Sequence, residues 1–350
     1  MSIMNKLKKN SKIKSTEVLS ESKFFNEMEM VSTDVPMINV ALSGDVDGGL
    51  SSGLTVLAGP SKNYKTSFAL LMAASYLKAH DDAIILFYDS EFGSPQSYFK
   101  EFGIDTSRVL HTPVANIEEL KFDIVSQLEN IDRNDNVIVV IDSIGNIASK
   151  KELEDAINEK SVADMSRAKA LKGLFRMCTP YLTMKNIPMI AINHIYESMG
   201  LFPTKIVSGG TGIYYSANNI WIMGRQQDKQ GTEIKGYHFV INIEKSRYVK
   251  EKSKIPISVS WEGGVQKWSG LLEVAIAGGY VVKPSNGWYQ RVDQDTGELV
   301  GTKVREKDTL NSEFWEDIFN KTDFKEFIRK QYQIGKTSTV SFDDIVQEEE

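Results

Sequence analysis

The chain has 350 residues with a formal net charge of −6, and 41% of them are hydrophobic and 25% charged, as in an ordinary soluble globular protein. This length predicts about two domains, one with a sizeable α/β core, and the negative balance does not by itself indicate a nucleic-acid binder. The single cysteine, Cys178, excludes an internal disulfide and fits a reducing compartment, and four histidines without close spacing argue against a structural zinc site. We expect no membrane span, because no run approaches ~18 apolar residues, and no secretory signal, because residues 1–15 lack an apolar stretch.

The two ends of the chain carry opposite charges. Five lysines precede the first acidic residue and five acids close the chain: Lys6, Lys8, Lys9, Lys12 and Lys14, then Asp343, Asp344, Glu348, Glu349 and Glu350. Such ends are typical of disordered segments that aid solubility, and the alternative is an interaction arm and an acidic tail that competes with polyanions. Next to the basic arm, residues 16–29 predict an amphipathic helix and residues 35–42 an extended apolar segment, which could cover the core or dock on a neighbouring subunit.

The chain is organised around a short apolar strand at 54–58, a loop of turn-forming residues and a helix at 67–79. This order is typical of a phosphate-binding loop, whose backbone N–H groups and helix N-terminus attract phosphate oxygens. Lys65 is expected to reach the β- and γ-phosphates, and the Thr66 hydroxyl to hold Mg2+. The candidate cofactor-binding residues of this stretch are Gly59, Pro60, Ser61, Lys62, Asn63, Tyr64, Lys65, Thr66 and Ser67.

Tyr64 departs from the usual pattern of such loops, which has glycine immediately before the Lys-Thr pair. Glycine suits that position because it tolerates positive φ and lets the backbone approach the ligand. Tyr64 is therefore expected either to take an ordinary backbone conformation or to be strained. Taken alone, the stretch could also be a strand–turn–helix with a solvated lysine.

Strand-like and helix-like segments alternate up to residue 192. Strands are predicted at 84–88, 108–112, 137–141 and 188–192, and helices at 95–102, 117–131 and 162–184. The run 137–141 has five consecutive β-branched residues, as expected for a strand buried on both faces. The alternation predicts an α/β fold, with a mostly parallel central sheet flanked by helices.

Beyond residue 217 the pattern changes. Strands predicted at 220–223, 237–244 and 255–261 lack intervening helices, which indicates an antiparallel extension of the sheet. From residue 268 a small α+β unit follows, with helices at 270–277, 311–319 and 323–332. The predicted organisation is a basic arm with an N-terminal helix and strand for subunit packing (1–40), the α/β core that holds the phosphate-binding loop (41–267), the small C-terminal domain (268–335) and an acidic tail (336–350).

Acidic residues follow two of the predicted parallel strands, at the edge where open α/β sheets bind ligands. Asp142 ends one strand and is expected in the Mg2+ shell, with a helix N-cap as the alternative. Glu91 lies just past another strand and could be the general base that polarises an attacking water. Acids in this position also serve as caps.

His194 and the loop behind it form a second group of candidates. His194 follows the strand at 188–192 and could sense the γ-phosphate, although a lone histidine is more often structural. The loop at 195–217 is long and rich in small residues, which predicts a mobile, functional segment. We expect it to contact a sugar-phosphate backbone through Lys205, Ser208, Gly209, Gly210, Thr211 and Gly212.

Two further charged segments each admit two interpretations. Residues 150–165 mix lysines with acids, as in a solvated helical face or in a second nucleic-acid loop. Lys245 and Arg247 leave a strand of the antiparallel region. They form either an exposed basic hairpin or a pair of cations that completes the nucleotide site of a neighbouring subunit.

Together these segments resemble the RecA-type recombinases, and among them those of T4-like phages. The likeness extends over residues 22–332 and rests on Gly59-Pro-Ser-Lys-Asn-Tyr-Lys-Thr66, Phe87-Tyr-Asp-Ser-Glu-Phe-Gly93, Val140-Ile-Asp-Ser143, Ala191-Ile-Asn-His194, Ser208-Gly-Gly-Thr-Gly212 and Glu244-Lys-Ser-Arg247. It implies a RecA-like P-loop ATPase core in which Lys65 and Thr66 bind phosphate and Mg2+, Asp142 is the second-strand acid and Glu91 is the catalytic glutamate. An aromatic residue before the Lys-Thr pair is also a habit of the phage branch.

The resemblance implies further roles. Tyr98 stands where the family stacks an aromatic ring on adenine, and His194 stands where bacterial members have a glutamine sensor. Lys245 and Arg247 match catalytic cations that reach ATP across the subunit interface. Residues 152–165 and 196–212 match the two DNA-binding loops.

The implied function is that of a DNA-dependent ATPase which, with ATP and Mg2+, forms helical filaments on single-stranded DNA. It would exchange strands with homologous double-stranded DNA in phage recombination, repair and replication. The implied partners are phage single-strand-binding and recombination-mediator proteins, in the cytoplasm of the infected bacterial host. The alternatives are a ring-forming helicase or ATPase on the same core, and an ATP-gated DNA-coating protein with little turnover. The charge of −6 fits a filament, because each subunit repeats a small basic site.

Overall fold

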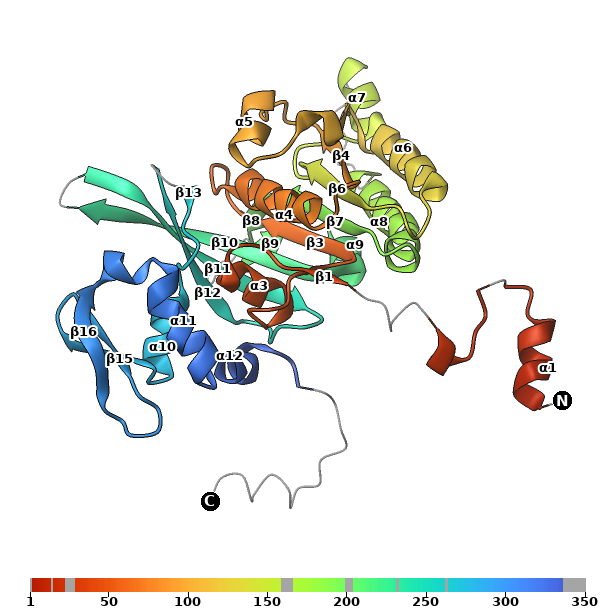
Figure 1. Cartoon of the computed structure of the whole chain (residues 1–350). Coiled ribbons are helices and arrows are strands. Elements are labelled where there is room, and N and C mark those ends of the chain that lie inside the picture. Colours follow the sequence, from red (N-terminus) through yellow and green to blue (C-terminus); the bar gives the residue numbers. More distant parts are fainter. Residues whose placement is uncertain are drawn as a thin grey trace.

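A nine-stranded sheet forms the centre of the protein (Figure 1), seen here in a computed structural model of the chain. The strands lie in the order β13-β12-β11-β10-β3-β7-β6-β4-β5. The structure describes residues 2–13, 15–22, 29–158, 166–198, 204–230, 233–261 and 264–335. Within these ranges no helix is long and apolar enough to cross a bilayer.

One half of the sheet is parallel and the other antiparallel. The parallel strands are β3 (Gly53–Ala58), β4 (Ile84–Asp89), β5 (Val109–Pro113), β6 (Val137–Asp142) and β7 (Pro188–Asn193). The extension consists of β10 (Ala217–Gln230), which joins β3 in parallel, and then β11 (Glu233–Ser246), β12 (Lys254–Ser260) and β13 (Gly264–Val265), all antiparallel. This arrangement confirms the predicted fold class and places the carboxyl ends of the parallel strands along one edge.

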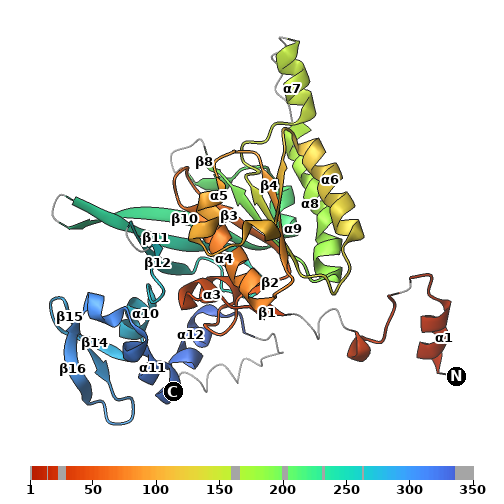
Figure 2. The same cartoon turned by 45° about the horizontal axis from the view of Figure 1, so that its top comes forward.

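Helices cover both faces of the sheet (Figure 2). One face packs against α3 (Pro36–Ser43), α4 (Lys65–Ala79) and α5 (Gln96–Glu101), and the other against α6 (Ile117–Asn130), α8 (Ser166–Met184) and α9 (Thr211–Ser216). The strands feed both cores by alternation: in β3, Leu57 belongs to the first cluster and Val56 to the second. Burial on both faces explains the uninterrupted apolar runs that predicted these strands.

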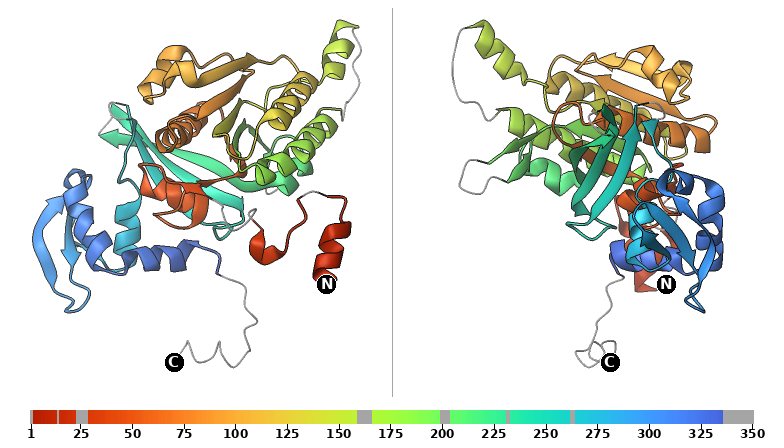
Figure 3. Two further views of the ribbon diagram at one scale, coloured as in Figure 1. Left: turned by 45° about the vertical axis from the view of Figure 1, so that its right-hand side comes forward. Right: turned by 90° about the vertical axis from the view of Figure 1, so that its left-hand side faces the viewer.

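The C-terminal unit packs beside the antiparallel half of the sheet (Figure 3). It contains α10 (Leu271–Ala277), the sheet of β14 (Val281–Ser285), β15 (Trp288–Val292) and β16 (Leu299–Arg305), the 3-10 turn η3 (Glu306–Thr309), α11 (Ser312–Lys321) and α12 (Phe324–Tyr332). Ion pairs from α12 fix it to the core, Arg329 to Asp45 at 2.7 Å and Lys325 to Asp47 at 2.9 Å. The predicted boundary at residue 268 stays a prediction.

The N-terminal segment differs from its prediction. Residues 36–42 are not extended: they lie in α3, which has Pro36 at its first position and is followed by Gly44 in the left-handed conformation with φ 78°. Because α3 is buried almost all round, its apolar run lacks the amphipathic periodicity that would distinguish a helix from an extended segment. The strand of this arm is β1 (Met30–Val31), which pairs with β2 (Leu50–Ser51).

The ends of the chain and two loops complete the description. The basic arm contains a helix, α1 (Ile3–Asn10), which buries no residue, whereas disorder was expected there. Of the helix predicted at 16–29, residues 16–22 and 29 are described, and among them only the 3-10 turn η1 (Leu19–Glu21) is helical. Residues 23–28 and the acidic tail 336–350 lie outside the described residues. The remaining elements are η2 (Thr106–Arg108), α7 (Lys150–Ile157), and the hairpin of β8 (Ile195–Glu197) and β9 (Lys205–Val207), which replaces part of the loop expected at 195–217.

Candidate nucleotide and DNA sites

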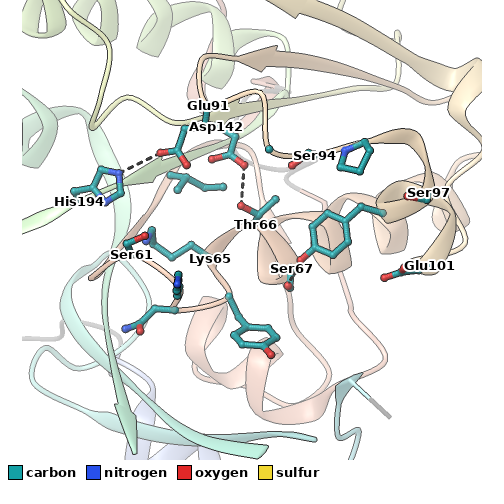
Figure 4. Close-up of a pocket in the computed structure, with 17 residues that line it drawn as sticks. Ser61, Lys65, Thr66, Ser67, Glu91, Ser94, Ser97, Glu101, Asp142 and His194 are labelled. Atoms are coloured by element: carbon teal, nitrogen blue, oxygen red, sulfur yellow. Dashed lines mark hydrogen bonds and ion pairs between the residues drawn. The ribbon is translucent and has the colours of Figure 1, made fainter. Parts of the chain in front are cut away.

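A cavity of about 480 Å³ opens at the carboxyl edge of the parallel strands (Figure 4). Its wall includes six residues singled out in the sequence, which come from the first turn of α4, from the segment after β4 and from the ends of β6 and β7: Lys65, Thr66, Glu91, Tyr98, Asp142 and His194. Of the other predicted cofactor-binding residues, Ser61, Lys62, Asn63, Tyr64 and Ser67 also line it, whereas Gly59 and Pro60 do not. The parallel topology causes this convergence, since strand ends far apart in the sequence meet at one edge.

The phosphate-loop segment has the expected shape and is strained in the expected place. Tyr64 takes the left-handed conformation with φ 53°, and so does Lys62 with φ 61°. The ring of Tyr64 packs on Phe239, with centroids 5.6 Å apart, so the side chain that a glycine would lack is used for packing. Lys65 is buried, and its Nζ donates to the carbonyls of Gly59 at 3.1 Å and Pro60 at 2.7 Å.

Burial lowers the pKa of Lys65, and the carboxylates of Glu91 and Asp142 oppose that shift. The two backbone carbonyls are weak partners for a buried ammonium group compared with phosphate oxygens. The amine is therefore held in place, ready to exchange the carbonyls for an anionic ligand.

Thr66 and Asp142 form a pair suited to a divalent cation. The Thr66 hydroxyl donates to Asp142 Oδ2 at 2.7 Å, while Asp142 Oδ1 is buried with no hydrogen-bond partner among the described residues. Burial raises the pKa of Asp142 to about 6, against the opposing hydrogen bond from Thr66. A buried carboxylate oxygen without a partner is costly, so the donor set fits Mg2+, which takes one or two protein oxygens and completes its shell with water and phosphate. In keeping with this small donor set, the described residues contain no cluster of three or more acidic, His or Cys ligands.

Glu91 is oriented by three donors. Its Oε1 accepts from Ser143 Oγ at 2.5 Å, from Asn146 Nδ2 at 3.1 Å and from His194 Nε2 at 3.1 Å. Asp89 fixes the turn beneath it, because its Oδ1 accepts from the backbone N–H of Glu91 at 3.0 Å. Sequence reasoning missed Ser143 and Asn146, whose only signal is their position just after the strand that Asp142 ends.

The backbone after His194 ties the cavity to the loop expected to contact DNA. Ser208 N–H donates to the His194 carbonyl at 3.0 Å, and Asn193 Nδ2 donates to the Ser208 carbonyl at 2.7 Å. Arg167, at the start of α8, donates to Ser208 Oγ at 3.3 Å and to the Gly145 carbonyl at 2.6 Å. A displacement of His194 therefore reaches Ser208 without any intervening side chain.

Tyr98 lines the cavity, and its hydroxyl is hydrogen-bonded to Ser67 Oγ. Tyr98 also lines a second hollow of about 640 Å³, whose wall includes the aromatic rings of Phe102 and Trp261. Trp261 is 56% exposed, which is unusual for so large an apolar side chain. Sequence reasoning used Trp261 only as the end of a strand and missed its place beside the cavity.

Lys245 and Arg247 do not line the cavity of their own chain. Lys245 pairs with Ile220, which in turn pairs with Val56 in the middle of β3. Arg247 lies nearer the amino end of β3, since its N–H donates to the Asn218 carbonyl at 3.0 Å. Lys245 Nζ donates to the Tyr214 carbonyl, its pKa is lowered by burial, and Arg247 is exposed. Within one chain, this pair therefore does not reach a ligand held in the cavity.

The residues expected to contact DNA gather around the start of α9. Lys205 is exposed on β9, Gly209 and Gly210 have φ of 98° and 77°, and Thr211 begins α9. At Gly212 a Cβ atom would stand 2.7 Å from Lys172 of α8, so only glycine allows the two helices to approach this closely. The other segment, 152–165, is described as far as residue 158, and its described part is mainly the helix α7.

Sequence reasoning missed a row of cations on α8. Lys169, Lys172 and Arg176 are exposed and follow one another at intervals of three and four residues, so they lie on one side of the helix. This row runs beside α9, against which α8 packs. Its signal was the helical spacing of the three charges within the predicted helix.

Comparisons with known proteins agree with this architecture. The family described as "RecA N-terminal domain" matches residues 2–266, and "Bacteriophage T4, Recombination and repair protein, C-terminal domain" matches residues 268–328. The "Recombination and repair protein" of Enterobacteria phage T4 is 50% identical over 337 residues, which cover 95% of this chain and 86% of that protein. "Protein RecA" of Chloroherpeton thalassium is 25% identical over 300 residues, covering 83% of this chain and 81% of that protein.

Proposed function

The chain belongs to the RecA family of recombinases, in the branch of the phage T4 protein UvsX, and on this premise we propose that it hydrolyses ATP with Mg2+ in a filament on single-stranded DNA. The observation that carries the proposal is the convergence of Lys65, Thr66, Glu91 and Asp142 in one cavity. A buried cation, a hydroxyl–carboxylate pair and an oriented glutamate are the parts that phosphoryl transfer to water requires.

Each of these residues has a separate task. The loop N–H groups and Lys65 hold the β- and γ-phosphates, and Thr66 and Asp142 hold Mg2+, which when bound neutralises negative charge on the phosphates. Glu91 accepts a proton from the attacking water through Oε2. The hydrogen bonds from Ser143, Asn146 and His194 all go to the other oxygen, Oε1. Tyr98 supports the adenine ring beside the aromatic hollow.

His194 is proposed to couple the nucleotide to DNA. It touches Glu91 through its ring and Ser208 through its carbonyl. A change at Glu91 caused by the γ-phosphate thus alters the start of the segment 208–212. Lys205, the glycines of that segment and the row on α8 then bind the sugar-phosphate backbone in a repeating arrangement along the filament.

The remaining parts of the proposal concern assembly. Lys245 and Arg247 of one subunit complete the nucleotide site of the next and draw the two together when ATP is bound. The N-terminal arm, residues 1–40, packs on a neighbouring subunit, an interpretation supported by α1, which has Ile3, Met4 and Leu7 exposed on its surface. We further propose partnership with phage single-strand-binding and recombination-mediator proteins, in the cytoplasm of the infected bacterium.

The experiment is to measure ATP hydrolysis with and without long single-stranded DNA, and strand exchange between circular single-stranded and homologous linear duplex DNA. We expect hydrolysis to require Mg2+ and to rise strongly with single-stranded DNA, and joint molecules to form only with ATP. ATP-dependent DNA binding with neither ATP turnover nor joint molecules would instead support an ATP-gated DNA-coating protein.

A further inference from the structure

An arginine outside the cavity holds the phosphate-loop segment from the side. Arg225 of β10 donates from Nη1 to the Lys62 carbonyl at 2.8 Å, and its guanidinium carbon lies 4.6 Å from the centre of the Tyr237 ring. Next to it, Asn63 Nδ2 donates to the Met223 carbonyl at 2.9 Å. Two consecutive residues of the loop are therefore attached to one strand.

The attached peptide is one that needs support. Lys62 is left-handed with φ 61°, a conformation that costs a non-glycine residue roughly 1 kcal/mol or more. In a planar trans peptide the C=O and the following N–H point in opposite directions. Because Arg225 draws the Lys62 carbonyl toward β10, the N–H of Asn63 is directed away from β10. The hydrogen bond thus sets the direction of a donor in the segment that binds phosphate.

Arg225 lies on the part of β10 that extends beyond the parallel strands of the sheet. The pairing of β10 with β3 ends at Ile222, opposite Ala58, whereas Arg225 pairs with Phe239 of β11 only. The Tyr237 ring that supports Arg225 also lies 6.0 Å from the Tyr64 ring, centroid to centroid. The outer part of the β10–β11 hairpin is therefore in contact with both left-handed residues of the loop.

We propose that Arg225 is a positioning residue for nucleotide binding, which holds the phosphate-binding segment in its binding conformation through the Lys62 carbonyl. This inference rests on the nucleotide site proposed above. Arg225 contacts the loop and not the reacting atoms, so its loss weakens the capture of ATP and leaves the chemical step intact. The sequence gives no hint of it, because 163 residues separate the two partners.

The test compares Arg225→Met, which keeps an apolar stem on Tyr237 and removes every donor, with Arg133→Met. Arg133 is the matched control because its Nη1 donates to a backbone carbonyl, that of Met184, at the same distance of 2.8 Å on an exposed surface. KM for ATP and kcat are measured on saturating single-stranded DNA at low and high salt, together with ATP affinity of the free proteins and their melting temperatures. We expect Arg225→Met to raise KM about tenfold with kcat within about twofold of the wild type, since a hydrogen bond from a charged group is worth about 1.5 kcal/mol.

The KM ratio of variant to wild type is expected to be the same at both salt concentrations, because salt does not change the orientation of a peptide group. A long-range attraction between the Arg225 cation and the phosphates would instead be screened by salt. An unchanged KM, a ratio that falls toward one in high salt, a loss in kcat alone or an equal loss in Arg133→Met would each overturn the inference. Failure of the wild type itself to bind ATP would instead refute the nucleotide site.

Discussion

The nucleotide cavity and the α8–α9 surface use charge in opposite ways. In the cavity, Lys65 and Asp142 are 6% and 4% exposed, and each makes hydrogen bonds to fixed neighbours. On the α8–α9 surface, the cations Lys169, Lys172 and Arg176 are exposed beside a segment rich in glycine. Buried charges are costly when their partners change, whereas exposed cations act additively and are screened by salt. Substitutions in the cavity should therefore abolish single steps, and those on the surface should change affinity gradually.

The largest expected effect is that of Lys65→Ala. Removing the buried amine leaves phosphate oxygens without their cation, which should weaken ATP binding at least about a hundredfold, since loss of one partner of a buried charge pair costs about 3 kcal/mol. Calorimetric titration with ATP measures the loss, and Lys78→Ala on the same helix, whose Nζ makes an exposed ion pair with Asp34, is the control. Normal nucleotide affinity in Lys65→Ala would show that this is not the phosphate-binding loop.

Glu91→Gln separates binding from turnover. The amide keeps an oxygen for Ser143 and Asn146 but cannot accept a proton from water, so hydrolysis should fall about a hundredfold while ATP-dependent DNA binding persists. Steady-state hydrolysis and DNA-binding titrations on the same preparation check this. Wild-type turnover in the variant would remove Glu91 from its assigned role.

The double change Lys245→Ala and Arg247→Ala tests the contact between subunits. Since neither side chain lines the cavity of its own chain, hydrolysis should fall about tenfold or more on DNA, with unchanged ATP affinity of the free subunit. The measurements are hydrolysis on long single-stranded DNA and ATP titration of unassembled protein. A loss of ATP affinity in the unassembled protein as large as the loss of hydrolysis on DNA would contradict a role across the interface.

Asp142→Asn should make the metal-free protein more stable. The pKa of Asp142 in the folded protein, about 6, lies above the ordinary value of 3.8. Above pH 6 the folded protein therefore holds a buried negative charge, which lowers its stability relative to the unfolded chain. The wild-type protein therefore gains stability from this group as the pH falls from 6 toward 4. The variant should exceed the wild type by about 3 kcal/mol at pH 8, and the difference should become small near pH 4. Melting curves without Mg2+ at both pH values measure this, and a variant less stable than wild type at pH 8 would contradict the assigned burial cost.

The smallest effects belong to the α8 surface. Single changes of Lys169, Lys172 or Arg176 to alanine should each lower the affinity for single-stranded DNA only a few-fold and reduce the salt dependence by about one phosphate contact. Fluorescence anisotropy over a range of salt concentrations measures both quantities. The same measurements on Lys150→Ala, in the neighbouring helix α7, allow the second predicted DNA segment to be compared with the α8 row. Unchanged salt dependence in all three variants would remove this row from the DNA site.

Much of the fold could be predicted because local pattern and tertiary environment agree. The β-branched run that became β6 is buried on both faces, and the amphipathic spacing of α6 has its apolar side in the core. The prediction failed at α3, where burial all round removes the periodicity that distinguishes a helix from a strand. Hydrophobic periodicity reports the difference between a buried and an exposed face, and α3 has no exposed face.

In the candidate site, too, some residues could be predicted from the sequence and others could not. Lys65, Thr66, Asp142 and Glu91 could be found because each follows a strand closely, and parallel strands bring those positions to one edge. Arg225 could not, since its contact with Lys62 depends on the register of β10 and the course of a loop far away in the sequence. Short-range motifs show where ligands bind, whereas the residues that hold a motif in place depend on the folded structure.

The central claim is that the nucleotide site lies between subunits of a filament, and electron microscopy tests it most directly. The specimen is the protein with Mg2+, a slowly hydrolysed ATP analogue and long single-stranded DNA. We predict continuous helical filaments in which Lys245 and Arg247 of one subunit face the γ-phosphate held by Lys65 of the next, with DNA against α8 and α9. Closed rings on unstretched DNA, or filaments in which both cations face solvent, would contradict the account.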